Sequence, residues 1–298
     1  MYLMLNRFEI VVEDWVIRKR LEDYLFDRFP DLSRSYIREI IRDGRCEVNG
    51  RIENRGFRVR GRDFIEIELD LARQTAMRPE PIDFEIIYED SDVLIADKPA
   101  GMLVHPTNFE RSGTLLNAVA FYLRNRNTSH STVRPGLIHR LDKDTSGIIA
   151  ISKNASFHRA LARQFAGKKV DKRYFAVVEG LVADNAGRIT LPIGRFAEQK
   201  IWDVKPDGKP SITEFSVIKR GNRRTLLEIL CITGRTNQIR IHLSKIGHPI
   251  VGDEIRGGGK SARLYLHSAK LSFRHPVSGE TVNFESPVPA EFGSILDS

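Results

Sequence analysis

Residues 136–147 have the sequence GLIHRLDKDTSG, and the apolar run IIAI at residues 148–151 follows directly. A dense polar loop that leads into a buried strand is where a fold exposes reactive groups on a rigid support. Because Asp142 lies close to the cationic Arg140, we expect its carboxylate to stay ionised at neutral pH. An ionised carboxylate held in place can act as a nucleophile or a base. Spacing alone favours a simpler interpretation, a turn with a satisfied salt bridge.

The composition indicates a globular chain with a surplus of positive charge. The chain has 298 residues, of which 41% are hydrophobic and 29% charged, and its formal net charge is +8. This length is enough for more than one domain, and the ordinary balance of residue types argues against disorder. The positive charge suits a polyanionic partner, although many basic proteins have none.

The sequence contains no signal for a membrane segment or a metal site. No apolar run approaches the roughly 20 residues of a membrane helix, and residues 1–13 lack the features of a signal peptide. Cys46 and Cys231 have no metal-type spacing, which argues against zinc and fits a reducing cytoplasm. Asp142 and Asp144 have no third carboxylate in their loop, so they are weak as a magnesium site. We therefore expect a cytoplasmic chain without membrane, metal or cofactor.

Residues 15–70 predict a small unit that begins with two helices. Apolar side chains follow helical spacing across residues 18–29, and Pro30 ends that segment. Ser33 is a good N-cap for a second helix over residues 34–42.

The remainder of this unit predicts a small sheet. Asn49-Gly50 is the strongest short signal for a hairpin, and residues 64–69 alternate apolar and acidic side chains as an edge strand does. The sequences LSRS at 32–35 and GRCEVNGR at 44–51, followed by this strand, are similar to S4-type RNA-binding domains. Gly61-Arg62-Asp63 stands where that family usually has Gly-Asp, a one-residue change in a turn.

Arginine is frequent in this unit, and its planar fork can donate two hydrogen bonds to one phosphate. The resemblance implies that Arg34, Arg38 and Arg45 contact RNA. By charge alone, a solvated basic face explains them equally well. An S4-type domain should mainly raise the affinity for RNA, with a steep dependence on salt.

The chain continues with a predicted linker, residues 71–83, which lacks periodicity. The second unit, residues 84–298, predicts strands at 84–88, 93–96, 148–151, 173–180, 212–218 and 225–232, helices at 114–123 and 155–165, and a hairpin at 271–284. Residues 191–210 predict a loop or hairpin over the site. The expected fold class is α+β: a small helix-pair and sheet domain, then a mixed, mainly antiparallel sheet whose central cleft holds Asp142.

Several motifs in the second unit together resemble the signatures of RluA-type pseudouridine synthases, including the RluC/RluD-like members. They are KPAG at 98–101 with HP at 105–106, HRLD and TSG within 139–147, KRYFA at 172–176, and GRTNQIRIH at 234–242. In that family the Asp of the HRLD tetrapeptide, here Asp142, is the essential catalytic residue. The resemblance covers nearly the whole chain from Trp15 onward.

The resemblance also implies roles for other residues. Tyr174 would stack on the target base, and Arg240 would pair with Asp142. Arg140 would enter the space that the flipped-out base leaves in the RNA stack, and Leu243 would line the uracil pocket. Further predicted contacts to substrate or RNA are His139, Thr145, Lys98 as a phosphate contact, and Asn237, which stands where many members have His. Without the resemblance, Tyr174 is a core aromatic residue and Lys98 a lysine of a surface turn.

Conversion of uridine to pseudouridine breaks an N-glycosidic bond, rotates the uracil and rejoins it through carbon, so it requires no cofactor. The residues leave open whether Asp142 attacks the uracil ring or abstracts a proton from the sugar. We expect a monomer that acts on large-subunit ribosomal RNA, with transfer RNA as the alternative. Two other classes remain: a non-catalytic RNA-binding or ribosome-assembly protein, and a glycoside hydrolase, for which no second carboxylate stands out.

Overall fold

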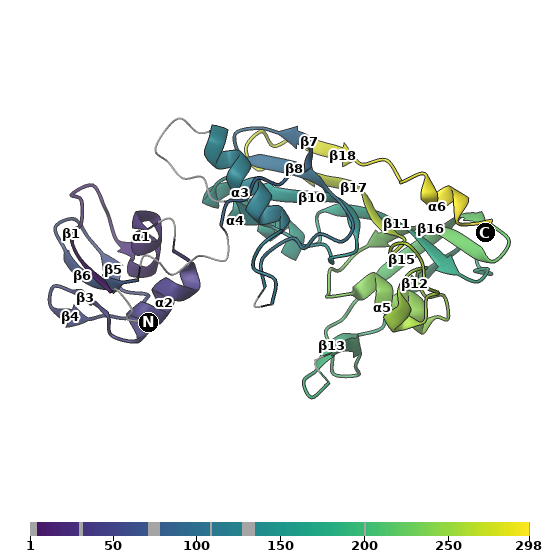
Figure 1. Ribbon diagram of the computed structural model, residues 1–298, viewed down its shortest axis with the longest axis horizontal. Coiled ribbons are helices and arrows are strands. Elements are labelled where there is room, and N and C mark those ends of the chain that lie inside the picture. The colour runs from purple at the N-terminus through teal and green to yellow at the C-terminus, as the bar shows by residue number, and fades with distance from the viewer. Residues whose placement is uncertain are drawn as a thin grey trace. The chain divides into compact units, whose positions relative to one another are not determined.

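The computed structural model describes residues 5–29, 32–70, 78–107, 109–126, 135–199 and 201–297 (Figure 1). The chain divides into two compact units, the first built mainly from residues 1–79 and the second mainly from residues beyond them. Of the predicted linker, residues 71–77 lie outside the described residues. In the ranges described, no helix is long and apolar enough to cross a membrane.

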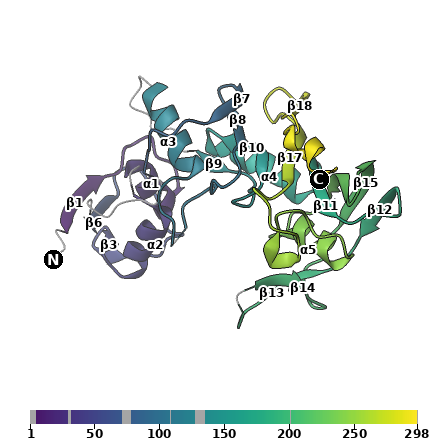
Figure 2. The same ribbon diagram turned by 45° about the vertical axis from the view of Figure 1, so that its right-hand side comes forward.

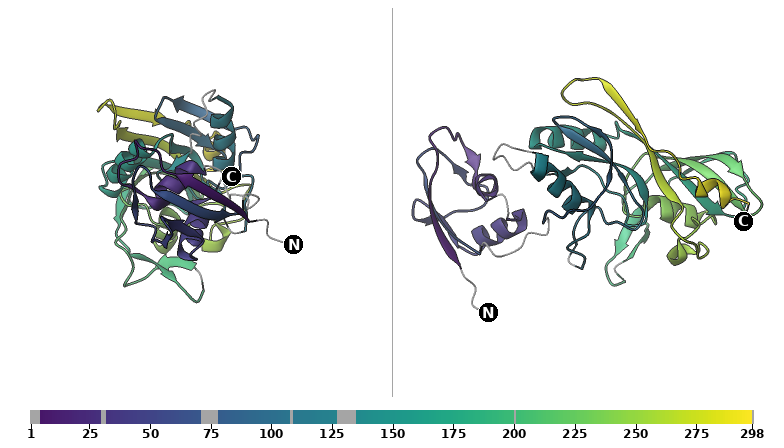
Figure 3. Two further views of the ribbon diagram at one scale, coloured as in Figure 1. Left: turned by 90° about the vertical axis from the view of Figure 1, so that its left-hand side faces the viewer. Right: turned by 45° about the horizontal axis from the view of Figure 1, so that its top comes forward.

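The first unit packs two helices against one face of a small sheet, as the sequence predicts (Figure 3). The helices are α1 (Leu21–Arg28) and α2 (Arg34–Arg42). The antiparallel sheet has the order β1 (Asn6–Val11), β6 (Phe64–Leu69), β3 (Cys46–Val48) and β4 (Arg51–Ile52). Alternation along β6 buries Ile65 and Ile67 in one core with Ile37 and Ile40 of α2.

Local sequence explains the predicted boundaries of this unit. The Ser33 hydroxyl accepts a hydrogen bond from the Tyr36 amide at 3.2 Å and so caps α2. Asn49 and Gly50 have φ values of 52° and 72°, which suit the tight turn between β3 and β4. Both predictions are confirmed. A cap and a tight turn depend only on residues close in sequence, so the sequence alone can predict them.

Three strands of the first unit were not expected from the sequence: β1, β2 (Lys19–Arg20) and β5 (Arg58–Val59). The helix predicted from residue 18 begins at Leu21, because Arg18 has a left-handed φ of 50° that a helix cannot contain. Lys19–Arg20 instead form β2, which pairs with β5 (Arg58–Val59). Strand β1 was also missed, since its pairing with β6 joins segments far apart in the sequence.

The second unit is built on a ten-stranded sheet. Its main path has the order β12 (Ala186–Ile189), β15 (Thr213–Arg220), β16 (Arg224–Cys231), β11 (Asp171–Glu179), β17 (Leu266–Arg274), β10 (Ser146–Ser152), β8 (Val93–Lys98) and β7 (Glu85–Glu89). Strand β18 (Thr281–Glu285) pairs with β17, and β9 (Gly136–Leu137) pairs with β10. Among the described strand pairs of this sheet, only β10 and β17 run parallel, so the predicted mixed and mainly antiparallel sheet is confirmed.

Helices lie along this sheet. The helices α3 (Leu115–Arg126) and α4 (Ala155–Ala166) lie beside the strands β7, β8 and β10 (Figure 1). Helix α5 (Gln238–Lys245), the short helix η1 (Glu254–Arg256) and α6 (Glu291–Ser294) belong to the other half. The hairpin β13 (Ile193–Phe196) and β14 (Ile201–Val204) fulfils the hairpin predicted over residues 191–210 and lies beside α5 (Figure 2).

The loop at residues 136–147 enters the sheet through a close contact between two backbones. Gly147 pairs with Ser268 of β17 in the parallel register and has a φ of 109°. A Cβ atom at this position would lie 2.2 Å from the Ser268 carbonyl oxygen. Only glycine fits there, so the end of the polar loop has one fixed position over the sheet.

Lys98, at the end of β8, holds the same loop from the other side. Its side chain is fully buried, and its ammonium donates to the carbonyl oxygens of Pro99 at 2.7 Å, Met102 at 2.8 Å and Lys143 at 2.8 Å. Burial lowers the pKa of Lys98 to about 8, which leaves the ammonium the prevailing form at pH 7. All three donors are used inside the protein, so the predicted phosphate contact of Lys98 is wrong.

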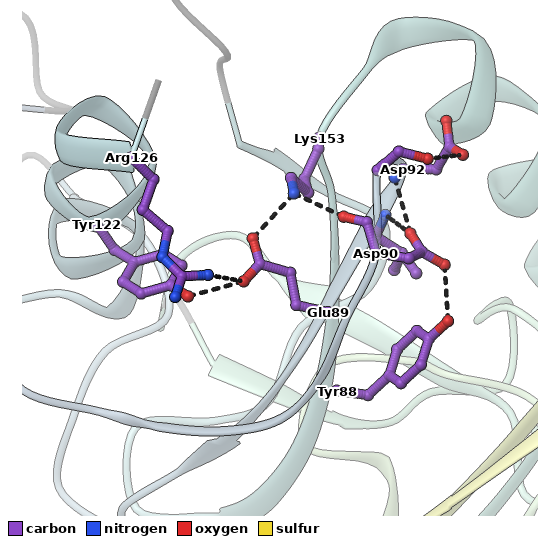
Figure 4. Close-up of polar contacts among 9 residues, drawn as sticks. Tyr88, Glu89, Asp90, Asp92, Tyr122, Arg126 and Lys153 are labelled. Carbon is purple, nitrogen blue, oxygen red and sulfur yellow. Dashed lines mark hydrogen bonds and ion pairs between the residues drawn. The ribbon is translucent and has the colours of Figure 1, made fainter. Parts of the chain in front are cut away.

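A second polar cluster fixes the turn between β7 and β8 (Figure 4). The Glu89 carboxylate accepts hydrogen bonds from Lys153 at 2.8 Å, Tyr122 at 2.7 Å and Arg126 at 3.1 Å. Burial raises the pKa of Glu89, but the hydrogen bonds from Lys153 and Tyr122 and the charges of Lys153 and Arg126 lower it overall. One carboxylate thus joins β7, α3 and the end of β10.

We expect Lys98→Met to lower the free energy of unfolding by about 3 kcal/mol or more, because three buried carbonyls lose their donor and each unpaired group costs about 1–3 kcal/mol. Urea denaturation measures this change. Lys270→Met is the matched control, since Lys270 is half-exposed and forms a surface ion pair with Glu285. Equal effects of the two substitutions would contradict the role given to Lys98.

We expect Glu89→Gln to destabilise the protein by about 1–3 kcal/mol at pH 7. Because folding lowers the pKa of Glu89, its contribution is present above the carboxyl pKa of the unfolded chain and is lost as the pH falls through the lowered value. The difference from wild type in urea unfolding should therefore shrink in acid. Glu85→Gln, at an exposed position of the same strand, serves as control. A difference that does not change with pH would refute this account.

Candidate active site

A cavity of about 370 Å³ lies in the second unit between the polar loop and α5. Its walls come from six parts of the chain: the loop at 138–145, the end of α4 with Lys168, the start of β11, the end of β16 with the segment that follows it, the first turn of α5, and Leu266 of β17. Its volume is in the range of small-molecule sites, which are clefts of about 300–1,000 Å³. The predicted central cleft is therefore present, and Asp142 lines it.

The carboxylate of Asp142 is mostly buried in the wall of this cavity. Arg240 approaches it, with its Nη1 atom 3.8 Å from Asp142 Oδ2. Burial raises the pKa of Asp142, and the positive charges of Arg240 and Arg140 oppose that rise without cancelling it. The pKa of Asp142 therefore lies above that of an ordinary Asp, although the two arginines favour its charged form, as the sequence predicts.

The stronger partner of Arg240 is Asp253, just before η1. The Arg240 guanidinium donates from Nε and Nη2 to the two carboxylate oxygens of Asp253, each at 2.7 Å. This geometry is bidentate, and the Asp253 side chain is only 1% exposed. Asp253 therefore orients the guanidinium that faces Asp142. The sequence patterns gave no sign of this contact.

Asn237 provides the closest polar contact of Asp142. Its amide nitrogen lies 2.9 Å from Asp142 Oδ2 and 3.3 Å from Oδ1, the orientation in which the amide donates to the carboxylate. The residue precedes α5 with φ 54° and ψ 22°, a left-handed conformation that Asn tolerates better than most residues. Its amide is turned toward the carboxylate, and the residue also lines the cavity, so its contact with RNA stays a prediction.

Tyr174 and Thr145 both line the cavity. Tyr174 comes from β11 and is buried, and burial raises the pKa of its phenol above the ordinary range, so the hydroxyl stays protonated. The Thr145 hydroxyl is buried and has no hydrogen-bond partner among the described residues. A buried donor and acceptor on a cavity wall is available to a ligand.

Two predicted substrate contacts have other roles in the structure. The His139 ring stacks on Phe165 with centroids 4.9 Å apart, and its Nε2 accepts a hydrogen bond from the Ala150 amide at 3.0 Å. Burial lowers the pKa of His139 to about 3, so the ring is a neutral part of the cavity wall and not a cation for RNA. Leu243 is fully buried and does not line the cavity, so its predicted role in the uracil pocket is wrong.

Arg140, Arg34 and Arg38 are exposed, and Arg45 is partly buried. Arg140 lines the cavity and is open to solvent. In the first unit, Arg34 pairs with Asp23 at 2.7 Å, and Arg38 pairs with Glu22 at 2.7 Å. Arg45 has Glu39 and Asp43 at 4.0 and 3.9 Å. Each of the three arginines thus already faces a carboxylate of its own unit.

The structure adds cations that the sequence did not single out. Lys172 and Arg235 line the cavity, one beside Tyr174 in the KRYFA motif and the other in GRTNQIRIH. Their position within the motifs is the signal that could have identified them. Within the described ranges, no group of three or more His, Cys, Asp or Glu residues is arranged to hold a metal ion.

Comparisons with known proteins agree with this architecture. The family described as RNA pseudouridylate synthase matches residues 92–245, and the S4 domain matches residues 19–65. An uncharacterized RNA pseudouridine synthase of Bacillus subtilis is 35% identical over 298 residues, covering 99% of this chain and 98% of the relative. The ribosomal large subunit pseudouridine synthase D of Xanthomonas campestris is 34% identical, covering 97% of this chain and 92% of the relative.

The fold is also shared with a solved structure. The human RNA pseudouridylate synthase domain containing 1 superposes with a TM-score of 0.58 at 23% identity, covering 72% of this chain and 84% of that one. The match to the family covers more than half of the chain, and the similarity to the bacterial relatives extends over nearly all of it. The chain therefore belongs to the RNA pseudouridylate synthase family and carries an S4 domain on its amino-terminal side.

Proposed function

We propose that Asp142 is the catalytic carboxylate of this RNA pseudouridine synthase and that its target is a uridine of large-subunit ribosomal RNA. The observation that carries the assignment of Asp142 is a mostly buried carboxylate in a cavity wall, with the Asn237 amide 2.9 Å away and the Arg240 guanidinium 3.8 Å away. The choice of RNA is supported by similarity to relatives that are named ribosomal large subunit pseudouridine synthase D. Transfer RNA is the alternative target.

The surrounding residues supply complementary contacts. A uridine cannot be reached inside a stacked helix, so it must be flipped out into the cavity. In this proposal Tyr174, which lines the cavity, supports the base, and the Thr145 hydroxyl, unpaired among the described residues, accepts or donates a hydrogen bond to uracil or ribose. Arg140, exposed beside the cavity, is free to enter the space that the base leaves in the RNA stack.

Asp142 acts in its charged form by either route, whether it attacks the uracil ring or removes a sugar proton. Asn237 and Arg240 both favour that form, one by hydrogen bonding and the other by charge. Asp253 contributes indirectly, because it holds Arg240 in place and its own charge raises the pKa of Asp142. Asn237 and Asp253 are therefore positioning residues.

We expect Asp142→Asn to abolish tritium release from ribosomal RNA labelled at the uracil carbon that becomes the new glycosidic carbon. Asp144→Asn, an exposed position of the same loop, is the matched control and should retain release. The assay is run with a chelator and with RNA that lacks pseudouridine. Tritium release by Asp142→Asn would refute the assignment of Asp142 as the catalytic carboxylate. No release by wild type from ribosomal or transfer RNA would favour a non-catalytic RNA-binding role.

We expect Asn237→Ala to shift the acid limb of the kcat–pH profile upward by about one pH unit. A hydrogen bond to a charged group is worth roughly 1.5–3 kcal/mol, and one pKa unit corresponds to about 1.4 kcal/mol. Loss of the donor raises the pKa of Asp142 further, so activity is lost at a higher pH as the solution is acidified. Asn237→Asp should shift the acid limb of the kcat–pH profile to a still higher pH, because it places a second negative charge beside Asp142 and raises the pKa of Asp142 further.

Asn222→Ala, an exposed position of the same unit, is the control for these profiles. If kcat fell equally at every pH in Asn237→Ala, the residue would have a purely structural role. An unchanged profile would show that the amide does not act on Asp142.

A further inference from the structure

Two large apolar side chains stand exposed on one loop of the first unit. Trp15 is 74% exposed and Ile17 is 85% exposed, whereas Val12 and Val16 of the same loop are buried in the core. An isolated exposed apolar residue is ordinary, but an exposed Trp next to a second large side chain is not explained by packing. The buried valines anchor the loop and leave Trp15 and Ile17 facing solvent.

The backbone of this loop is held by the turn before β6. The Gly61 amide donates to the Val16 carbonyl at 3.0 Å, and the Arg62 amide donates to the Val12 carbonyl at 2.8 Å. A Cβ atom on Gly61 would lie 2.8 Å from the Asp14 Cα atom, so the two segments are in direct contact. Trp15 is therefore presented by an anchored loop, which lowers the entropy cost of binding through it.

Arginines lie on the segments that adjoin this loop. Arg20 of β2 lies directly opposite Arg58 of β5, and the Arg58 guanidinium donates to the Arg18 carbonyl at 3.0 Å. Arg60 is exposed two residues further on. Four arginines here have no carboxylate within ion-pair distance among the residues that the structure describes, namely Arg18, Arg20, Arg58 and Arg60.

This distribution of charge differs from that on α2. Arg34 and Arg38 are paired with carboxylates, and Arg62, in the turn before β6, pairs with Asp14 of the loop at 3.0 Å. Like charges directly opposite each other on paired strands are destabilising, so the facing Arg20 and Arg58 carry a cost that an anionic partner would remove. The surface thus combines an aromatic platform with unneutralised cations, which is how proteins hold single-stranded nucleic acid.

We propose that Trp15, Ile17, Arg18, Arg20, Arg58 and Arg60, the Trp15 patch, bind a single-stranded segment of the RNA substrate. Trp15 stacks on an unpaired base, and the arginines contact the adjacent phosphates. The proposal rests on the proposed RNA substrate, and it moves the main RNA contact of the first unit away from Arg34, Arg38 and Arg45. A protein partner is disfavoured, because only two large apolar side chains of this loop are exposed and the nearby strands carry arginines without ion-pair partners among the described residues.

The test uses the full chain, which has two tryptophans, Trp15 and Trp202. In a Trp202→Phe background, titration with a short unstructured oligouridylate should quench the Trp15 emission. Trp15→Ala should weaken binding of the same oligonucleotide about 5- to 100-fold, as expected for one stacked base, without changing its salt dependence. Arg60→Gln should instead reduce the slope of log affinity against log salt by about 0.7.

Matched controls lie in the same unit. Ile52→Ala removes an apolar side chain that is 65% exposed, and Arg7→Gln removes an arginine that is paired with Glu66. Neither should alter RNA affinity by more than about twofold, whereas Trp15→Phe should restore part of the loss, because Phe also stacks. Circular dichroism checks that each variant is folded.

Absence of quenching, together with an affinity of Trp15→Ala equal to that of Ile52→Ala, would overturn the proposal. Tritium release separates this outcome from a failure of the proposed function. If wild type releases tritium and Trp15→Ala binds RNA normally, only the proposed role of the Trp15 patch is refuted. Impaired binding by Trp15→Ala with no release by wild type leaves the patch standing and refutes the catalytic assignment. At saturating RNA, kcat of Trp15→Ala should equal that of wild type.

Discussion

The carboxylate of Asp142 is largely removed from water, and the groups around it must offset the free energy of that burial. Asn237 does so with a hydrogen bond and Arg240 with a positive charge, but Arg240 is itself buried enough to need Asp253. The result is a chain of alternating charges that runs from the cavity into the protein. A carboxylate with a raised pKa in such a setting is typical of residues that exchange protons or act as nucleophiles.

The loop that carries Asp142 is fixed at several places by groups that do no chemistry. The Lys98 ammonium binds the Lys143 carbonyl, and Gly147 lets the strand after the loop approach β17 closely. The Glu89 cluster joins the neighbouring strands to α3. Precise placement of a reactive carboxylate therefore depends on a buried lysine and a glycine as much as on the residues that line the cavity.

Sequence patterns predicted local features well and long-range ones less well. The Ser33 cap, the Asn49-Gly50 turn and the alternation at residues 64–69 depend on neighbouring residues, and all three are confirmed. The expected edge position of the strand at 64–69 is wrong, because β6 lies between β1 and β3, and both of these partners are set by long-range pairing. Strand β1 and the pairing of β2 with β5 depend on distant partners and were missed.

The candidate site shows the same division. Four residues that the motif resemblance singled out line one cavity: Asp142, Tyr174, Thr145 and Arg240. The resemblance could not show which other side chains of the motifs point into that cavity. Lys98 and Leu243 lie in the motifs yet are fully buried, because burial is decided by packing against elements elsewhere in the chain. The bidentate partner of Arg240 was missed for the same reason: its contact crosses from α5 to the segment before η1.

The parallel pairing of β10 with β17 has a consequence for synthesis of the protein. Ser146, at the end of the polar loop, contacts His267 of β17, which follows 121 residues later. Strands this far apart pair only after the intervening chain has been made, and such non-local contacts form slowly. On the ribosome, the segment with Asp142 emerges long before the strand that fixes it. The candidate site therefore stays unassembled until β17 has been translated.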